Sequence, residues 1–260
     1  MINTRLQVAY DGTGFNGWAQ QPNARTIERE LTRAIDRLHD ARGDVVVAGR
    51  TDAGVHATGQ VVSVLRQGGP PTAALPRALN DILPTDIVVT AADEVPADFS
   101  ARFSARSRSY TYDVRLGQLR DPLQCRRELH EPRQLDRAVL DTLAATIVGE
   151  HDFRAFTPAE TEHKTFTRTV QTARWVDTES GIRFEITANA FLRHMVRTLV
   201  GTMIVTARGD RGNAPELFPA LLTGSLRSEA GWTAPAHALC LVHVDYVSGT
   251  GSDPRRLRGG

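Results

Sequence analysis

The chain has 260 residues, 41% of them apolar, which is enough for one large domain or two small ones with a buried core. Its net charge of +1 does not by itself indicate a nucleic-acid partner, and its two cysteines exclude a disulfide framework. The first ten residues lack the apolar segment of a signal peptide, and no run approaches the roughly 20 apolar residues that span a bilayer. We therefore expect a cytoplasmic protein with no membrane partner.

Strands and helices alternate in the N-terminal half. Apolar residues recur at helical spacing from Ile27 to Leu38, and Thr26 precedes them as a candidate N-cap. The expected elements are a strand at 5–10, a polar loop at 11–22, a helix at 26–39, strands at 45–48 and 59–65, a helix at 72–80 and a strand at 86–95.

The C-terminal half has a similar mixture. The expected elements are a strand at 109–116, a helix at 135–147, strands at 165–177 and 181–189, a long apolar helix at 191–208, a shorter helix at 215–222 and a strand at 239–247. This pattern predicts an α+β fold: two mixed halves, 1–105 and 106–248, whose antiparallel sheets are flanked by helices around a central basic cleft. Residues 249–260 are expected to form a disordered tail.

The basic residues are unusual in kind, because Lys164 is the only lysine and all the others are arginines. Seven arginines lie between Arg102 and Arg127, against two aspartates, Asp113 and Asp121. Arginine suits phosphate contacts and base stacking better than lysine does. The segment therefore indicates either a phosphate-binding patch or a solvated arginine-rich face.

The run Gly49-Arg50-Thr51-Asp52-Ala53-Gly54-Val55-His56-Ala57 places one carboxylate in a polar turn between two apolar segments. Glycines on both sides let the backbone bend tightly and approach a ligand closely. Asp52 is therefore expected at a strand end, displayed toward a cleft. The alternative is that the aspartate and glycine only make a turn.

Gly12-Thr13-Gly14-Phe15-Asn16-Gly17 matches the glycine spacing of a dinucleotide-binding loop. Such a loop opens directly into a helix, whereas polar residues and Pro22 intervene here, so the match does not predict nucleotide binding. Asp52 and His56 are four residues apart, but no third metal ligand is evident nearby. We expect no metal site and a structural, hydrogen-bonding His56.

Tyr110 and Tyr112 share one face of the predicted strand, with arginines before them. The pair indicates either sheet packing or an aromatic platform for a base. Arg193 and Arg197 are one turn apart in the predicted long helix. An arginine in an apolar helix needs a charged partner or a phosphate, unless the arginines only form a solvated flank.

The run from Gly49 to Ala57 closely resembles the active-site motif of the tRNA pseudouridine synthase A family. The loop after Tyr10 and the run from Asn189 to Arg197 resemble two further motifs of that family. Shorter matches in family order lie at 78–80, 83–87, 101–105, 152–153 and 241–246. Ala19, Ser100 and Cys240 depart from the family pattern.

This resemblance implies that Asp52 is the catalytic aspartate, that Tyr110 stacks on the target uracil, and that Arg197 pairs with the catalytic carboxylate. Arg50 is a second arginine expected at the substrate. The implied activity converts uridine to pseudouridine at tRNA positions 38, 39 and/or 40 in the anticodon stem-loop, by a homodimer and without a cofactor. The alternatives are a pseudouridine synthase acting on another RNA and a non-catalytic RNA-binding protein, with a metal-dependent hydrolase more distant.

Overall fold

One continuous sheet of 11 strands runs through the computed structural model, which describes residues 1–161, 164–209 and 214–246. The strands are β1 (Ile2–Tyr10), β2 (Ala41–Arg42), β3 (Val46–Val47), β4 (His56–Gln67), β5 (Ile87–Glu94), β6 (Ala105–Leu116), β7 (Leu129–Glu131), β8 (Gly149–Asp152), β9 (Thr167–Thr178), β10 (Gly181–Ala188) and β11 (Leu239–Tyr246). The helices are α1 (Ile27–Leu38), α2 (Leu75–Asn80), α3 (Arg137–Thr146), α4 (Met195–Ala207) and α5 (Ala214–Leu217). The mixed content and mostly antiparallel sheet confirm the predicted α+β class.

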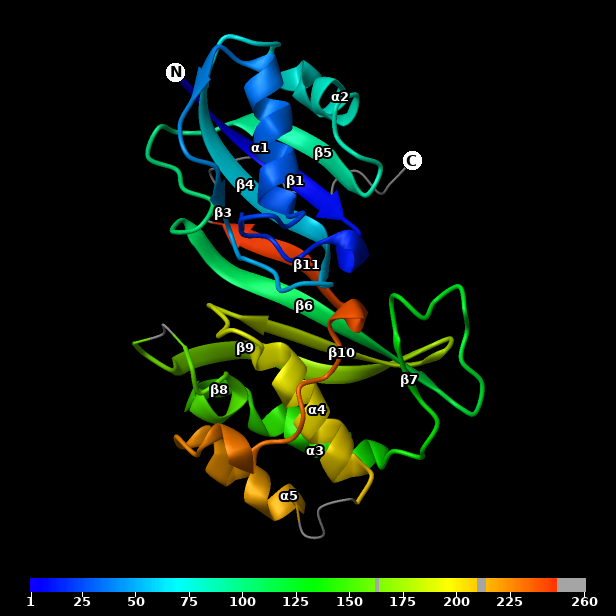
Figure 1. The fold of residues 1–260 in the computed structure, drawn as a ribbon. Coiled ribbons are helices and arrows are strands. Elements are labelled where there is room, and N and C mark those ends of the chain that lie inside the picture. The colour runs from blue at the N-terminus through cyan, green and yellow to red at the C-terminus, as the bar shows by residue number, and fades with distance from the viewer. Residues whose placement is uncertain (162–163, 210–213, 247–260) are drawn as a thin grey trace, which may run out of the picture.

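The strand order is β5-β1-β4-β11-β6-β10-β9-β8. Strand β11 therefore lies in the middle of the sheet, with the N-terminal strands on one side and the strands from β6 onward on the other (Figure 1). It pairs parallel to β4 at His56 and antiparallel to β6 along most of its length. Because β11 lies between β4 and β6, both halves depend on it for a continuous sheet.

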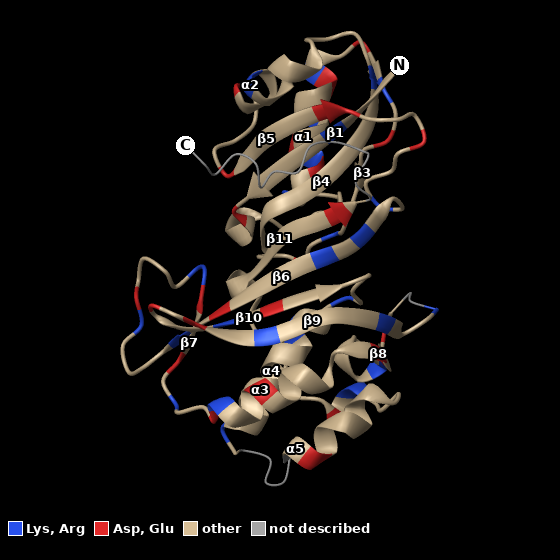
Figure 2. Ribbon diagram, turned by 180° about the vertical axis from the view of Figure 1, so that it is seen from behind, with Lys and Arg blue, Asp and Glu red and all other residues tan. Residues whose placement is uncertain are grey.

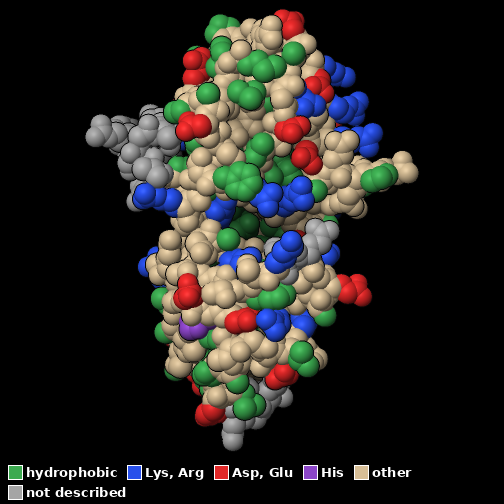
Figure 3. Space-filling view, turned by 90° about the vertical axis from the view of Figure 1, so that its left-hand side faces the viewer, with side chains coloured by type: hydrophobic (Ala, Val, Ile, Leu, Met, Phe, Trp, Pro, Cys, Tyr) green, Lys and Arg blue, Asp and Glu red, His purple; other side chains and the backbone are tan. Residues whose placement is uncertain are grey.

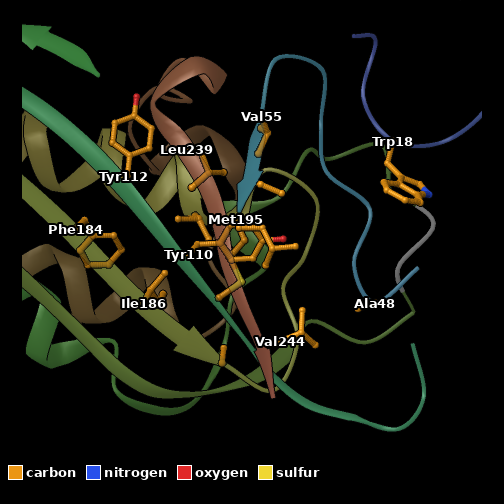
Figure 4. Packing of buried hydrophobic residues seen from close by; sticks show 14 of the residues in the cluster. Trp18, Ala48, Val55, Tyr110, Tyr112, Phe184, Ile186, Met195, Leu239 and Val244 are labelled. Atoms are coloured by element: carbon orange, nitrogen blue, oxygen red, sulfur yellow. The ribbon is translucent and has the colours of Figure 1, made fainter. Parts of the chain in front are cut away.

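The helices cover one face of the sheet, with α1 and α2 on the N-terminal half and α3 and α4 on the other (Figure 1). Tyr112, Phe184 and Met195 are buried between the strands and α4, within a cluster shown in Figure 4. The view from behind shows β6, β10 and β9 without a helix in front of them (Figure 2). A cavity of about 590 Å³ lies on this uncovered face, lined by residues that include Ser109 and Thr111 but not Asp52.

Some elements begin or end at other residues than predicted, because the local backbone conformation differs from what the apolar periodicity indicates. Helix α4 begins at Met195 rather than residue 191, because His194 has a left-handed backbone with φ of 62°. The strand expected at 45–48 is reduced to β3. Thr26 stands at the N-cap of α1, but its hydroxyl makes no capping bond and is buried without a partner.

The helix expected at 72–80 is divided into a 3-10 turn, Thr72–Ala74, and α2. The helix expected at 215–222 is likewise divided between α5 and a 3-10 turn, Phe218–Leu222. The last residue of the strand expected at 239–247, and the tail expected at 249–260, lie outside the described residues. Along the described part of the chain, no helix combines the length and apolar character needed to cross a membrane.

Candidate active site

Asp52 lies in the turn that joins β3 to β4, as the sequence predicts. The turn closes with a hydrogen bond from the Val55 N–H to the Asp52 carbonyl at 3.1 Å, and Gly54 has a φ of 79°, which glycine adopts without strain. The Asp52 side chain is 26% exposed. The turn therefore presents a carboxylate that is partly buried yet open to a substrate.

The glycine-rich loop after β1 packs against the backbone of this turn. The Trp18 N–H donates to the Thr51 carbonyl at 3.0 Å, and Gly17 lies so close that a Cβ there would be 2.9 Å from the same oxygen. Trp18 itself is fully buried. The loop thus packs against the Asp52 backbone, which explains its glycines without a bound nucleotide.

A buried hydrogen-bond network fixes the residues just before Asp52. The Tyr10 hydroxyl and the Thr51 hydroxyl lie 2.8 Å apart, and Gln60 Nε2 donates both to Tyr10, at 3.1 Å, and to the Gly49 carbonyl, at 2.7 Å. Polar groups bonded in this way rigidify the backbone that carries them. The network therefore holds both ends of the run from Gly49 to Thr51.

Arg197 joins the two halves of the molecule at Asp52. Its Nη1 donates to Asp52 Oδ2 at 3.1 Å, and its Nε donates to the Ala234 carbonyl at 2.7 Å. Only 16% of the Arg197 side chain is exposed, so the charge requires the partner that the carboxylate supplies. Among the described residues Asp52 Oδ1 has no hydrogen-bond partner, which leaves that oxygen available to a substrate.

Tyr110 lies on β6, on the face covered by α4. Its ring packs edge-to-face on Phe191, with 5.0 Å between ring centroids, and the residue is 8% exposed. Burial raises the pKa of Tyr110, and the nearby Tyr10 and Asp52 raise it further. The hydroxyl therefore keeps its proton and can act as a donor but not readily as a base.

Arg50 is placed differently from Arg197. It is exposed, and no ion pair joins it to Asp52 or to another carboxylate among the described residues. Its guanidinium is therefore available to a phosphate or a base. Figure 3 shows a hollow between the two halves with basic side chains along both of its rims.

The structure does not bring the arginines between Arg102 and Arg127 together as one patch. Arg102 and Arg106 lie near the start of β6, whereas Arg120 and Arg126 lie beyond its end, in the loop that leads to β7. Figure 2 shows basic residues at the beginning of β6. Of these, Arg102 lies near the end of β3, because the Arg108 guanidinium donates to the carbonyls of both Arg102 and Ala48.

Arg108 is not part of an exposed patch, because it is buried and serves the architecture of the site. Burial lowers its pKa. Within the described part of the chain its guanidinium donates only to backbone carbonyls, those of Ala48 at 2.8 and 3.1 Å, Arg102 at 2.8 Å, Asn189 at 2.9 Å and Ala105 at 3.3 Å. Arg108 therefore ties Ala48, just after β3, to the segment that leads into β6 and to Asn189, just after β10.

His56 makes the hydrogen bonds that the sequence predicts for a structural histidine. Its Nδ1 accepts from the Gly12 N–H at 3.1 Å, and its Nε2 faces the carbonyls of Arg126 at 2.8 Å and His237 at 2.9 Å. The ring thus connects three loops around the first residue of β4. No group of three metal-binding side chains occurs in residues 1–161, 164–209 and 214–246.

His194 is a site residue that the sequence did not single out. The sequence predicts that Arg193 and Arg197 share a helix face, but α4 starts after His194, so Arg193 lies outside the helix. The His194 ring lies at the site instead, with Nε2 3.6 Å from Asp52 Oδ2. Histidine is enriched in left-handed conformations, and this was the one local signal for a break before Met195.

Comparison with known proteins identifies the family of the chain. A family model described as tRNA pseudouridine synthase matches residues 7–104 and 143–247. The chain is 38% identical to tRNA pseudouridine synthase A of Syntrophotalea carbinolica, over 95% of this chain and 97% of that protein. It is 40% identical to the Moorella thermoacetica protein of the same name, over 93% of this chain and 98% of that one.

A chain from the crystal structure of a Cbf5-Nop10-Gar1 complex also matches, with a TM-score of 0.36 and 12% identity, over 77% of this chain and 44% of that chain. The family model covers most of the chain, and the relatives align along nearly their whole length. The chain therefore belongs to the tRNA pseudouridine synthase A family and is an isomerase that converts uridine to pseudouridine in tRNA.

Proposed function

We propose that the protein acts on uridines 38, 39 and/or 40 of the tRNA anticodon stem-loop, with Asp52 as the catalytic carboxylate. The observation that carries the role of Asp52 is its 3.1 Å ion pair with Arg197, because the two residues come from the two most specific motifs of the sequence. The choice of uridines rests on the resemblance of those motifs to the tRNA pseudouridine synthase A family.

Each proposed residue has a separate task. Arg197 keeps Asp52 charged and turns its free oxygen toward the substrate. Tyr110 stacks on the uracil, and Arg50 contacts the RNA from the exposed rim. A uridine in a stem is stacked and paired, so it has to leave the stack to reach Asp52. In this proposal the flipped nucleotide enters the hollow between the two halves (Figure 3).

Release of tritium from tRNA labelled at uridine C5, followed by mapping of pseudouridine, tests the choice of uridines. We expect release from tRNAs with uridine at positions 38 to 40 and none when cytidine replaces these uridines. Pseudouridine formed at other positions would instead favour the alternative of a synthase with a different RNA specificity.

We also propose that the enzyme is a cytoplasmic homodimer and that one tRNA contacts both subunits, as the family resemblance implies. Sedimentation of the enzyme alone and with tRNA measures the mass directly. A dimeric mass that persists at the concentrations used for activity supports the proposal. A fully active monomer would contradict it.

A further inference from the structure

His194 holds a strained backbone conformation at the start of α4. Its φ is 62°, and its carbonyl accepts the first helical hydrogen bond, from the Thr198 N–H at 2.9 Å. This conformation costs a residue with a side chain about 1–2 kcal/mol, and such strain gathers at functional sites. In the described part of the chain only Asn23, φ 58°, is a second non-glycine residue with a positive φ, and it lies in the loop before α1.

The strained conformation brings the ring to the reacting carboxylate. His194 Nε2 lies 3.6 Å from Asp52 Oδ2, the oxygen that Arg197 also contacts. This distance exceeds that of a hydrogen bond, so the ring nitrogen is adjacent to Asp52 without being bonded to it. The His194 side chain is 24% exposed, so the residue is partly open to solvent.

The surroundings of His194 favour the neutral ring. Burial lowers the pKa of His194; Arg197, Arg193 and Arg227 lower it further, while Asp52 opposes them. These charged groups come from α4, from the segment before it, from the 3-10 turn Arg227–Glu229 and from the Asp52 turn. A neutral imidazole can accept a proton near neutral pH.

Pseudouridine formation requires such an acceptor. In the product, ribose C1′ is bonded to uracil C5, so C5 has lost a hydrogen and N1 has gained one. Tyr110 is poorly suited to take the proton from C5, because burial raises the pKa of its hydroxyl. Asp52 Oδ2 is engaged with Arg197, and Oδ1 has no hydrogen-bond partner among the described residues.

We propose that His194 accepts the proton released from C5 of the rotated uracil, an inference that rests on the proposed role of Asp52. The C5–H bond breaks, its electron pair restores the C5–C6 double bond, and the proton moves to a ring nitrogen of His194. The imidazolium then returns a proton to N1 or to water, so the enzyme is regenerated. C5 is bonded to C1′ at this stage, close to the carboxylate beside which the ring lies.

The variant His194→Gly tests the proposal with tRNA carrying hydrogen or deuterium at uridine C5. We expect single-turnover rates to fall roughly 10²-fold or more, the scale of lost general base catalysis. Loss of the C5 proton should become rate-limiting, so the deuterium isotope effect should rise above that of the parent enzyme. Added imidazole, which fits the space left by the side chain, should restore part of the rate.

The His194→Gly variant also distinguishes an effect on catalysis from an effect on folding. Because glycine adopts positive φ without strain, His194→Gly should keep or raise the melting temperature. Asn23→Gly is the matched control: it relieves the same conformation away from the site and should retain the rate and isotope effect of the parent.

A His194→Gly rate within about twofold of the parent, which corresponds to roughly 0.4 kcal/mol, would overturn the proposal. A slower variant with an unchanged isotope effect and no response to imidazole would also overturn it, in favour of a structural role. Asp52→Asn measured beside it distinguishes the two proposals. An active Asp52→Asn contradicts the proposed function, whereas an inactive Asp52→Asn with a normal His194→Gly contradicts only the role of His194.

Discussion

At the scale of single residues, one carboxylate oxygen of Asp52 is ion-paired with Arg197, and the other has no hydrogen-bond partner among the described residues. We expect Asp52→Asn to fold normally and to lose turnover, because the amide keeps the shape but not the charge or basicity. Single-turnover pseudouridine formation measures the loss, and Asp44→Asn, an exposed aspartate before β3, is the control. Residual activity within about tenfold of the parent, or roughly 1.4 kcal/mol of barrier, would rule out the assignment.

Tyr110 has a ring and a hydroxyl whose roles can be separated. We expect Tyr110→Ala to lose catalysis severely, because base–aromatic stacking is worth roughly 1–3 kcal/mol, and Tyr110→Phe to retain binding of the flipped base. Single-turnover rates and melting temperatures of both variants test this. Tyr112→Phe is the control, because it removes a hydroxyl that bonds to the Pro235 carbonyl.

The two alternatives for Tyr110 give different results. If the ring only packs against Phe191, Tyr110→Ala would lower the melting temperature while activity per folded molecule persisted. If Tyr110→Phe binds tRNA normally but turns over slowly, the hydroxyl acts as a proton donor, consistent with its raised pKa.

At the scale of elements, Arg108 ties the end of β3, next to the Asp52 turn, to the start of β6. We expect Arg108→Lys to lower the free energy of unfolding by about 1–3 kcal/mol, because a lysine cannot reach the same set of carbonyls with a planar fork. Denaturant unfolding measures this. Arg106→Lys, exposed on the same strand, should change stability by no more than about 0.5 kcal/mol. Equal stability of both variants would contradict the role of Arg108.

Most elements could be predicted from sequence because apolar periodicity persists along them, as it does from Ile27 to Leu38. The start of α4 could not, because Phe191 and Leu192 continue the apolar pattern while one backbone torsion at His194 ends the helix. The pairing of Arg197 with the catalytic carboxylate was implied by the family motif, and the structure brings Arg197 to Asp52.

The task of Arg108 was not predictable, because burial of a strand arginine depends on carbonyls from distant segments. Arg106 and Arg108 look alike in sequence, and only the fold separates an exposed arginine from a buried one. The division of the chain at residue 105 stays a prediction.

At the scale of the whole molecule, the exposed arginines near the start of β6 are expected to contact tRNA phosphates. Replacing both Arg102 and Arg106 by alanine should weaken binding and reduce the slope of log affinity against log salt by about 0.7–0.9 for each lost contact. Titrations at several salt concentrations measure the slope. The control is the pair Arg29→Ala and Arg33→Ala on α1, exposed and of equal charge. Equal losses for both pairs would show that net charge, rather than position, determines affinity.

The position of β11 between β4 and β6 also constrains how the protein is made. Both neighbours leave the ribosome long before the strand that separates them, so neither can complete its pairing during most of synthesis. Their open edges can meanwhile pair wrongly, with each other or with other chains. Contacts this distant in sequence form slowly. The sheet, and with it the junction where Asp52 meets Arg197, is therefore expected to close only after β11 has been synthesised.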